Sequence, residues 1–85
     1  MNVGVTLSDA ITALVAEKRA VGYKYHAEAQ VLARFEAFTR SEFPGTDTLT
    51  EASVQAWIVA ARRRGVTPAT LQSLAAPVRE LGRVC

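Results

Sequence analysis

Three short segments share one helix-start pattern, and this pattern limits the fold more than any other feature of the chain. In Val5-Thr6-Leu7, Leu49-Thr50-Glu51 and Val66-Thr67-Pro68, a threonine follows an apolar residue and precedes a run with apolar periodicity. A threonine in this position caps a helix, because its side chain accepts a hydrogen bond from an unpaired amide of the first turn. The apolar residue before it can pack against that turn. The pattern predicts helices that begin near Leu7, Glu51 and Pro68.

Apolar residues recur at helical spacing through four segments, which predicts helices over about 7–21, 25–43, 51–64 and 68–84. The first three predicted helices end at Gly22, at Pro44-Gly45 and at Gly65, respectively. No segment alternates with period two, so we expect an all-α fold, a compact four-helix bundle. The predicted buried residues are Leu7, Ile11, Leu14, Val15 and Val21; Val31, Leu32, Phe35 and Phe38; Val54, Trp57, Ile58 and Ala61; and Leu71, Leu74, Ala75, Val78 and Leu81.

Pro77 falls inside the last predicted helix. Its ring removes the backbone hydrogen bond to the Ser73 carbonyl and crowds that group. We therefore expect a kink at this position, or a break into two short helices.

The size and composition of the chain indicate one soluble domain. Its 85 residues are 49% apolar, which favours folding around a single small core. No apolar run is long enough to cross a membrane, and the N-terminus lacks a signal-peptide pattern. Cys85 is the only cysteine, so an internal disulfide is impossible. We expect a cytoplasmic protein with no membrane partner.

The residues that catalysis needs are scarce. His26 and Cys85 are the only histidine and cysteine, which leaves no zinc-ligand cluster. No serine lies in a nucleophile elbow, and no glycine-rich loop follows a strand. We predict no enzymatic activity, no metal, no cofactor and no small-molecule substrate.

Positive charge gathers in two blocks, although the formal net charge is only +2. Residues 18–24 hold Lys18, Arg19 and Lys24 and no acid, around the corner at Gly22. Residues 62–85 hold five arginines and one acid. Such blocks suit a surface that meets a phosphate backbone. Two tyrosines also flank this corner; we expect at least one to be in the core, and we assign a packing role to Tyr23.

Helical spacing brings polar residues into two stripes, and each stripe has two interpretations. One stripe is His26, Gln30 and Arg34 in the second predicted helix; the other is Gln72, Ala76, Arg79 and Arg83 in the fourth. Arginine and glutamine bind phosphates and base edges, but an ordinary solvent face would look the same. The run Arg62-Arg63-Arg64 at the end of the third helix is likewise either a phosphate contact or a solvated helix end.

Several segments resemble the N-terminal core-binding domain of tyrosine recombinases, the phage-type integrases. They are Ala20-Val21-Gly22-Tyr23-Lys24-Tyr25-His26, Leu32-Ala33-Arg34-Phe35-Glu36-Ala37-Phe38, Leu49-Thr50 with Val54-Gln55-Ala56-Trp57, and Thr67-Pro68-Ala69-Thr70-Leu71 with Leu74, Val78 and Arg79. The resemblance covers nearly all of residues 6–85.

This resemblance implies a SAM-like four-helix bundle that clamps a recombination site for a separate catalytic domain. It implies DNA contacts from the second and fourth helices, and so adds Thr70 and Ser73 to Lys24, His26, Gln30, Arg34, Gln72 and Arg79. The implied partners are double-stranded DNA, a catalytic domain of the same chain and other recombinase subunits. The family's catalytic residues belong to a following domain, so we expect these 85 residues to be a fragment of a longer recombinase. The alternative is a small helical protein–protein interaction domain, which the near-balanced charge and an exposed Val59 would favour.

Overall fold

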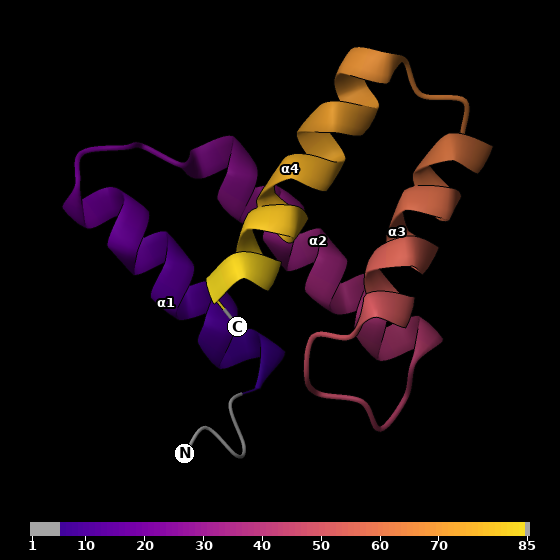
Figure 1. The fold of residues 1–85 in the computed structure, drawn as a ribbon, viewed down its shortest axis with the longest axis horizontal. Coiled ribbons are helices and arrows are strands. Elements are labelled where there is room, and N and C mark those ends of the chain that lie inside the picture. The colour runs from indigo at the N-terminus through magenta and orange to yellow at the C-terminus, as the bar shows by residue number, and fades with distance from the viewer. Residues whose placement is uncertain (1–5, 85) are drawn as a thin grey trace.

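Four α-helices make up the part of the chain that the computed structural model describes, residues 6–84. They are α1 (Leu7–Ala20), α2 (His26–Glu42), α3 (Glu51–Arg63) and α4 (Pro68–Val84), shown in Figure 1. No strand occurs within these residues, so the predicted all-α fold is confirmed. Each helix begins and ends within one residue of the predicted bounds.

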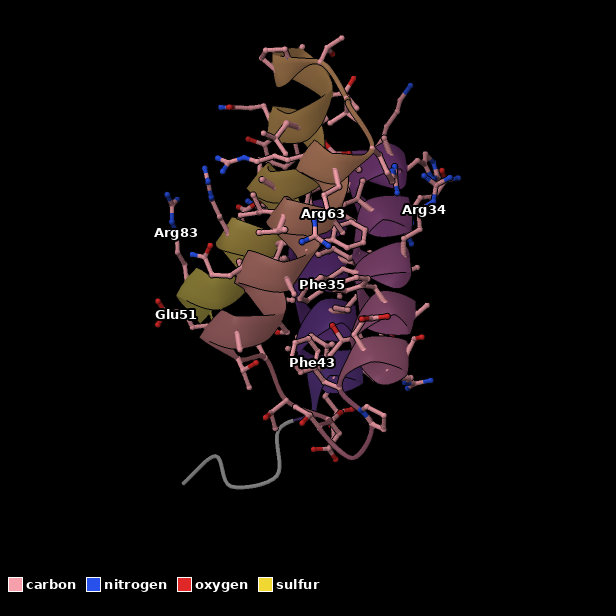
Figure 2. The ribbon with its side chains drawn as sticks, turned by 90° about the vertical axis from the view of Figure 1, so that its right-hand side faces the viewer. Arg34, Phe35, Phe43, Glu51, Arg63 and Arg83 are labelled. Atoms are coloured by element: carbon pink, nitrogen blue, oxygen red, sulfur yellow. The ribbon has the colours of Figure 1, made fainter. Side chains whose placement is uncertain are left out.

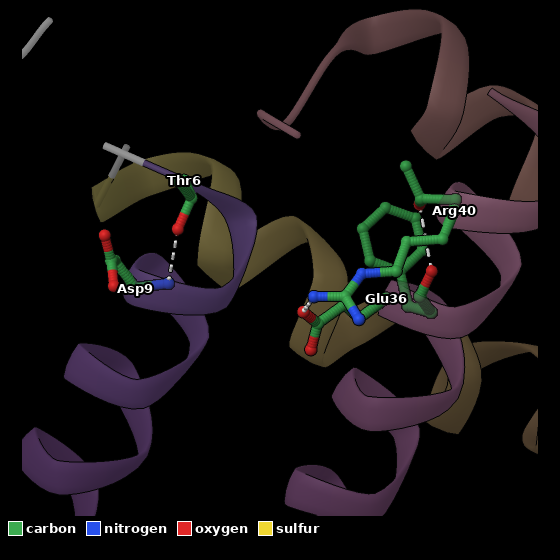
Figure 3. A network of polar contacts seen from close by, with 6 residues as sticks. Thr6, Asp9, Glu36 and Arg40 are labelled. Carbon is green, nitrogen blue, oxygen red and sulfur yellow. Dashed lines mark hydrogen bonds and ion pairs between the residues drawn. The ribbon is translucent and has the colours of Figure 1, made fainter. Parts of the chain in front are cut away.

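All three predicted threonine caps are present. Thr6, Thr50 and Thr67 each accept a hydrogen bond from the amide three residues on, at 3.1, 3.1 and 3.2 Å. The bond from Asp9 to Thr6 is drawn in Figure 3. At Thr50 the bond is reciprocal, because the Ser53 hydroxyl accepts from the Thr50 amide at 3.3 Å and completes a capping box. Each cap contributes about 1 kcal/mol to helix stability.

The apolar residues before two of these caps also behave as predicted. Leu49 and Val66 are partly buried and pack against the core. Val5, which precedes the first cap, lies outside the described residues.

The helices form two layers. Figure 1 shows α4 crossing in front of α2, and Figure 2, turned by 90°, shows α3 and α4 on one side with α1 and α2 on the other. The shortest dimension is 18 Å, about the depth of two packed helices. Of the described helices, α4 packs against each of the other three, while α1 and α3 do not contact each other. The same holds for α2, so α2 and α4 together join the two layers.

Trp57 of α3 lies at the centre of the aromatic part of the core. It is 7% exposed, and its ring meets Phe35 and Phe38 of α2 edge to face, with centroids 5.6 and 5.4 Å apart. Its indole N–H donates to the Leu74 carbonyl of α4 at 2.9 Å. The prediction of Trp57 as a core residue is confirmed, and its hydrogen bond fixes α3 on α4.

Two predictions at the α1–α2 corner are wrong. Val21 was expected on the buried face of the first helix, but α1 ends one residue earlier and Val21 is 68% exposed. Tyr23 was expected to pack, but it is 62% exposed, and Tyr25 is the buried tyrosine, at 8%. Gly22 takes a φ of 102°, which ends α1 as predicted and turns the two following residues outward.

Of the two outcomes predicted at Pro77, a kink or a break into two short helices, the break is wrong. α4 runs as one helix from Pro68 to Val84 with Pro77 inside it. Pro77 is buried, and Leu74 before it and Val78 and Leu81 after it belong to the same core. Burial of apolar side chains on both sides offsets the missing hydrogen bond, whose cost is about 3 kcal/mol.

Candidate nucleic-acid interface

The polar stripe of α4 is an open surface. Gln72, Ala76, Arg79 and Arg83 are all exposed, and together with Glu80 they line a shallow hollow of about 350 Å³. The spacing of four, three and four residues therefore brings these side chains to one face, as predicted. The small Ala76 beside the long side chain of Arg79 lets a flat or convex ligand approach the helix closely.

The polar stripe of α2 faces a different direction. His26, Gln30 and Arg34 are exposed, as an outward face requires. In Figure 2, however, Arg34 and Arg83 point to opposite sides of the molecule. The reason is that α2 and α4 belong to different layers and turn their apolar sides toward each other. The structure thus separates Arg34 from Arg83, which are the C-terminal members of the two predicted stripes.

The corner cations are divided between a paired lysine and two exposed side chains. Lys18 binds Glu80 of α4 through an ion pair, and its ammonium also lies 5.6 Å from the centre of the Tyr23 ring. The hydrogen bond to Glu80 raises the pKa of Lys18 despite partial desolvation. Arg19 and Lys24 are exposed.

Tyr25 links the same corner to α4. It occupies the N-cap position of α2 with a φ of 57°, a left-handed conformation that is uncommon for a bulky residue, and its side chain makes no cap. Instead its ring enters the core and its hydroxyl donates to Oε1 of Glu80 at 3.3 Å. Burial, together with the charge of Glu80, raises the pKa of Tyr25 to about 12.

The remaining predicted residues lie at the α3–α4 junction. Arg62 and Arg63 occupy the last turn of α3, Arg64 is its C-cap, and all three are exposed. Figure 2 shows Arg63 on the α3 side of the molecule. The hydroxyls of Thr70 and Ser73 are engaged locally, the first with Thr67 at 3.0 Å and the second with the Ala69 carbonyl at 3.1 Å.

Few cations in the described chain have an acidic partner. Within residues 6–84, Lys18 pairs with Glu80 and Arg40 pairs with Glu36, the second pair appearing in Figure 3. The other predicted cations make no ion pair with a described residue. They are Arg19, Lys24, Arg34, Arg62, Arg63, Arg64, Arg79 and Arg83.

Acidic groups collect at the opposite end of the bundle. The Leu7 amide donates to the Asp47 carbonyl, which fixes the start of α1 against the loop between α2 and α3. Exposed Asp9 lies in the first turn of α1, exposed Asp47 lies in this loop, and exposed Glu51 lies in the first turn of α3. The start of α1 and the loop between α2 and α3 are at the lower end of the molecule in Figure 1. Other acids lie among the cations, since Glu28 and Glu80 line a hollow at the α1–α2 corner together with Lys18 and Lys24.

Sequence reasoning missed the groups that tie the corner to α4. Tyr25 was not selected, and Glu80 was considered only as an acid near a basic stripe. No spacing rule could have found this contact, because residues 25 and 80 meet only through the packing of α2 on α4.

A groove between α2 and α4 adjoins this contact, with a volume of about 530 Å³. Small residues and Ser73 line it beside Tyr25, Glu28 and Glu80. Within the described residues, no group of three or more histidine, cysteine, aspartate or glutamate side chains could hold a metal ion. None of the described helices combines the length and apolar character needed to cross a membrane.

No family model matches the chain, and no curated protein sequence or solved structure is significantly similar to it.

Proposed function

We propose that this chain is a DNA-binding module of the tyrosine-recombinase type, which holds a recombination site for a separate catalytic domain. The observation that carries the proposal is the exposed α4 stripe, in which Arg79 and Arg83 lie free of any described acidic partner beside Gln72 and Ala76. The resemblance of the sequence to the core-binding domain points to the same helix.

The charge of Glu80 is compatible with this proposal. Glu80 follows Arg79 in the helix and would repel a phosphate if it stood alone. Its carboxylate is bound by Lys18 and by the Tyr25 hydroxyl, so its charge is compensated on the corner side. The stripe then presents two arginines and a glutamine toward a ligand.

We assign the α4 face as the primary contact and place the α2 stripe outside it. A duplex docked on Arg83 leaves Arg34 directed away from it, because the two side chains lie on opposite sides of the bundle. Guanidinium groups bind phosphates, and a neighbouring glutamine can reach a base edge in the major groove. With so few cations on one face, binding is expected near about 10⁻⁴–10⁻⁶ M, with a strong dependence on salt.

The test is a titration of the protein with duplex DNA at low salt, followed by amide NMR shifts. We expect shifts along α4, and about tenfold weaker binding for Arg79→Glu and for Arg83→Glu, since each reversal replaces an attraction by a repulsion. Arg40→Glu is the matched control, because Arg40 lies near the acidic end and is already paired with Glu36. No shifts, or shifts confined to the acidic start of α3, would exclude the proposal.

A second candidate function is a helical protein–protein interaction domain. The exposed apolar side chains favour it, with Val21 68%, Tyr23 62% and Val59 43% exposed. Such a domain would bind its partner independently of salt, and charge reversal at Arg79 would leave that binding unchanged. Val59→Ser and Tyr23→Ser would weaken it instead.

A further inference from the structure

Glu80 lies where three helices meet, and both of its carboxylate oxygens are occupied. Oε2 binds the ammonium of Lys18, from the last turn of α1. Oε1 accepts the hydroxyl hydrogen of Tyr25, from the start of α2, at 3.3 Å. The carboxylate is therefore directed from α4 toward the α1–α2 corner.

A competing partner for Glu80 stands on the same helix. Arg83 follows Glu80 by three residues, and side chains three apart on a helix are neighbours that form ion pairs readily. Both residues line the hollow beside Arg79 and Gln72. Within the described residues, however, Glu80 pairs with Lys18 and not with Arg83. The position of Lys18 thus determines whether the guanidinium of Arg83 is available.

We propose that Lys18 promotes DNA binding indirectly, as a positioning residue that holds Glu80 away from Arg83 and so keeps Arg83 free to bind a phosphate. This inference rests on the proposed function. It differs from the expectation that Lys18 itself contacts DNA, because its ammonium is occupied by Glu80 and packs over the Tyr23 ring.

Tyr25 supports this arrangement. Its ring is 8% exposed and anchored in the core, so its hydroxyl is held at a fixed place beside Glu80. The Tyr25 hydroxyl is protonated, and hence a donor, throughout the neutral range, and its raised pKa extends this to alkaline pH. Lys18 and Tyr25 together therefore engage both carboxylate oxygens of Glu80.

The experiment is a double-mutant cycle on affinity for duplex DNA, with wild type, Lys18→Met, Glu80→Gln and the double variant. We expect Lys18→Met to weaken binding about fivefold, because Glu80 would exchange a partly buried ion pair with Lys18 for one with Arg83. In the Glu80→Gln background the same change should cost less than about twofold, because no carboxylate remains to capture Arg83. Lys18→Arg, which keeps the cation, should bind like wild type.

Two outcomes would overturn the positioning role alone. One is that Lys18→Met costs as much or more in the Glu80→Gln background, which would make Lys18 a direct contact. The other is measured without DNA, on the side-chain NMR signal of the Arg83 guanidinium. This signal should shift in Lys18→Met but not in the double variant. An unchanged signal in Lys18→Met would refute the competition between Lys18 and Arg83 for Glu80. A wild-type protein that binds no duplex would instead overturn the proposed function, and this role with it.

Discussion

Replacing Trp57 by phenylalanine should weaken the fold substantially without abolishing it. Trp57 connects α3 to both α2 and α4. Its ring packs against Phe35 and Phe38 of α2, and its indole N–H donates to the Leu74 carbonyl of α4. Phenylalanine keeps an aromatic ring at this site but loses the donor and part of the buried ring. The change therefore measures what the indole N–H and the larger ring contribute beyond an apolar aromatic ring at this site.

The magnitude follows from what the substitution removes. The hydrogen bond contributes about 1 kcal/mol, and the Leu74 carbonyl keeps its helical partner afterwards. Two further buried ring carbons contribute about 1.6 kcal/mol, at roughly 0.8 kcal/mol for each buried carbon. The expected loss is thus about 2.5 kcal/mol. A domain of this size has a free energy of unfolding of about 4–13 kcal/mol, so the variant should remain folded.

The assay is urea denaturation followed by far-ultraviolet circular dichroism, because the substitution removes the only indole fluorophore. A loss of this size should also lower the melting temperature by about 10–20 °C. Val59→Ala is the control, since Val59 lies on the same helix and is 43% exposed; it should change the free energy of unfolding by less than about 0.5 kcal/mol. If Trp57→Phe costs less than about 1 kcal/mol with an unchanged denaturant slope, the role assigned to the indole is refuted.

Three further predictions concern the helix ends and the corner. Gly22→Ala should lower the free energy of unfolding by about 1 kcal/mol, because φ is 102° there. Gly82→Ala should raise it by about 0.5–1 kcal/mol, since Gly82 lies inside α4 and its new methyl would meet only Leu49 at 3.8 Å. Thermal melts that show the same sign for both variants would contradict this reasoning. Ser53→Ala should cost about 1–2 kcal/mol in urea denaturation, because it removes half of the capping box from a fully buried site, and a neutral result would exclude that contribution. The pKa of Tyr25 is raised from 10.0 to about 12, so the unfolded chain releases this proton at lower pH than the folded protein does. The contribution of Tyr25 to stability should therefore be fully present below pH 10 and should be lost as pH rises toward 12. Melting curves at alkaline pH test this, because the loss should be smaller in Tyr25→Phe.

Much of the fold could be predicted from the sequence because its signals are local. A threonine cap involves only four consecutive residues, so Thr6, Thr50 and Thr67 marked three helix starts correctly. A glycine with positive φ likewise ends a helix by its own conformational freedom, as Gly22 and Gly65 do. The exposed stripe of α4 followed from helical spacing for the same reason.

The predictions that failed depended on packing between helices. The sequence offered two tyrosines at one corner, and only the docking of α2 on α4 determines that Tyr25 is buried while Tyr23 is exposed. At Pro77 the local rule predicted a kink or a break, and the break is absent because burial of the flanking residues against the core keeps α4 continuous. In both cases the free energy of apolar burial exceeded a local preference.

The sequence by itself thus determined four helices, their bounds and the outward face of each, since these depend on hydrogen bonds and periodicity within one segment. Only the tertiary structure determined how those faces combine. Because α2 and α4 lie in opposite layers with their apolar sides together, Arg34 and Arg83 point to opposite sides of the molecule. The same packing brings Lys18, Tyr25 and Glu80 into one contact, although they belong to three different helices or their caps. A long-range contact of this kind leaves no periodic trace in the chain.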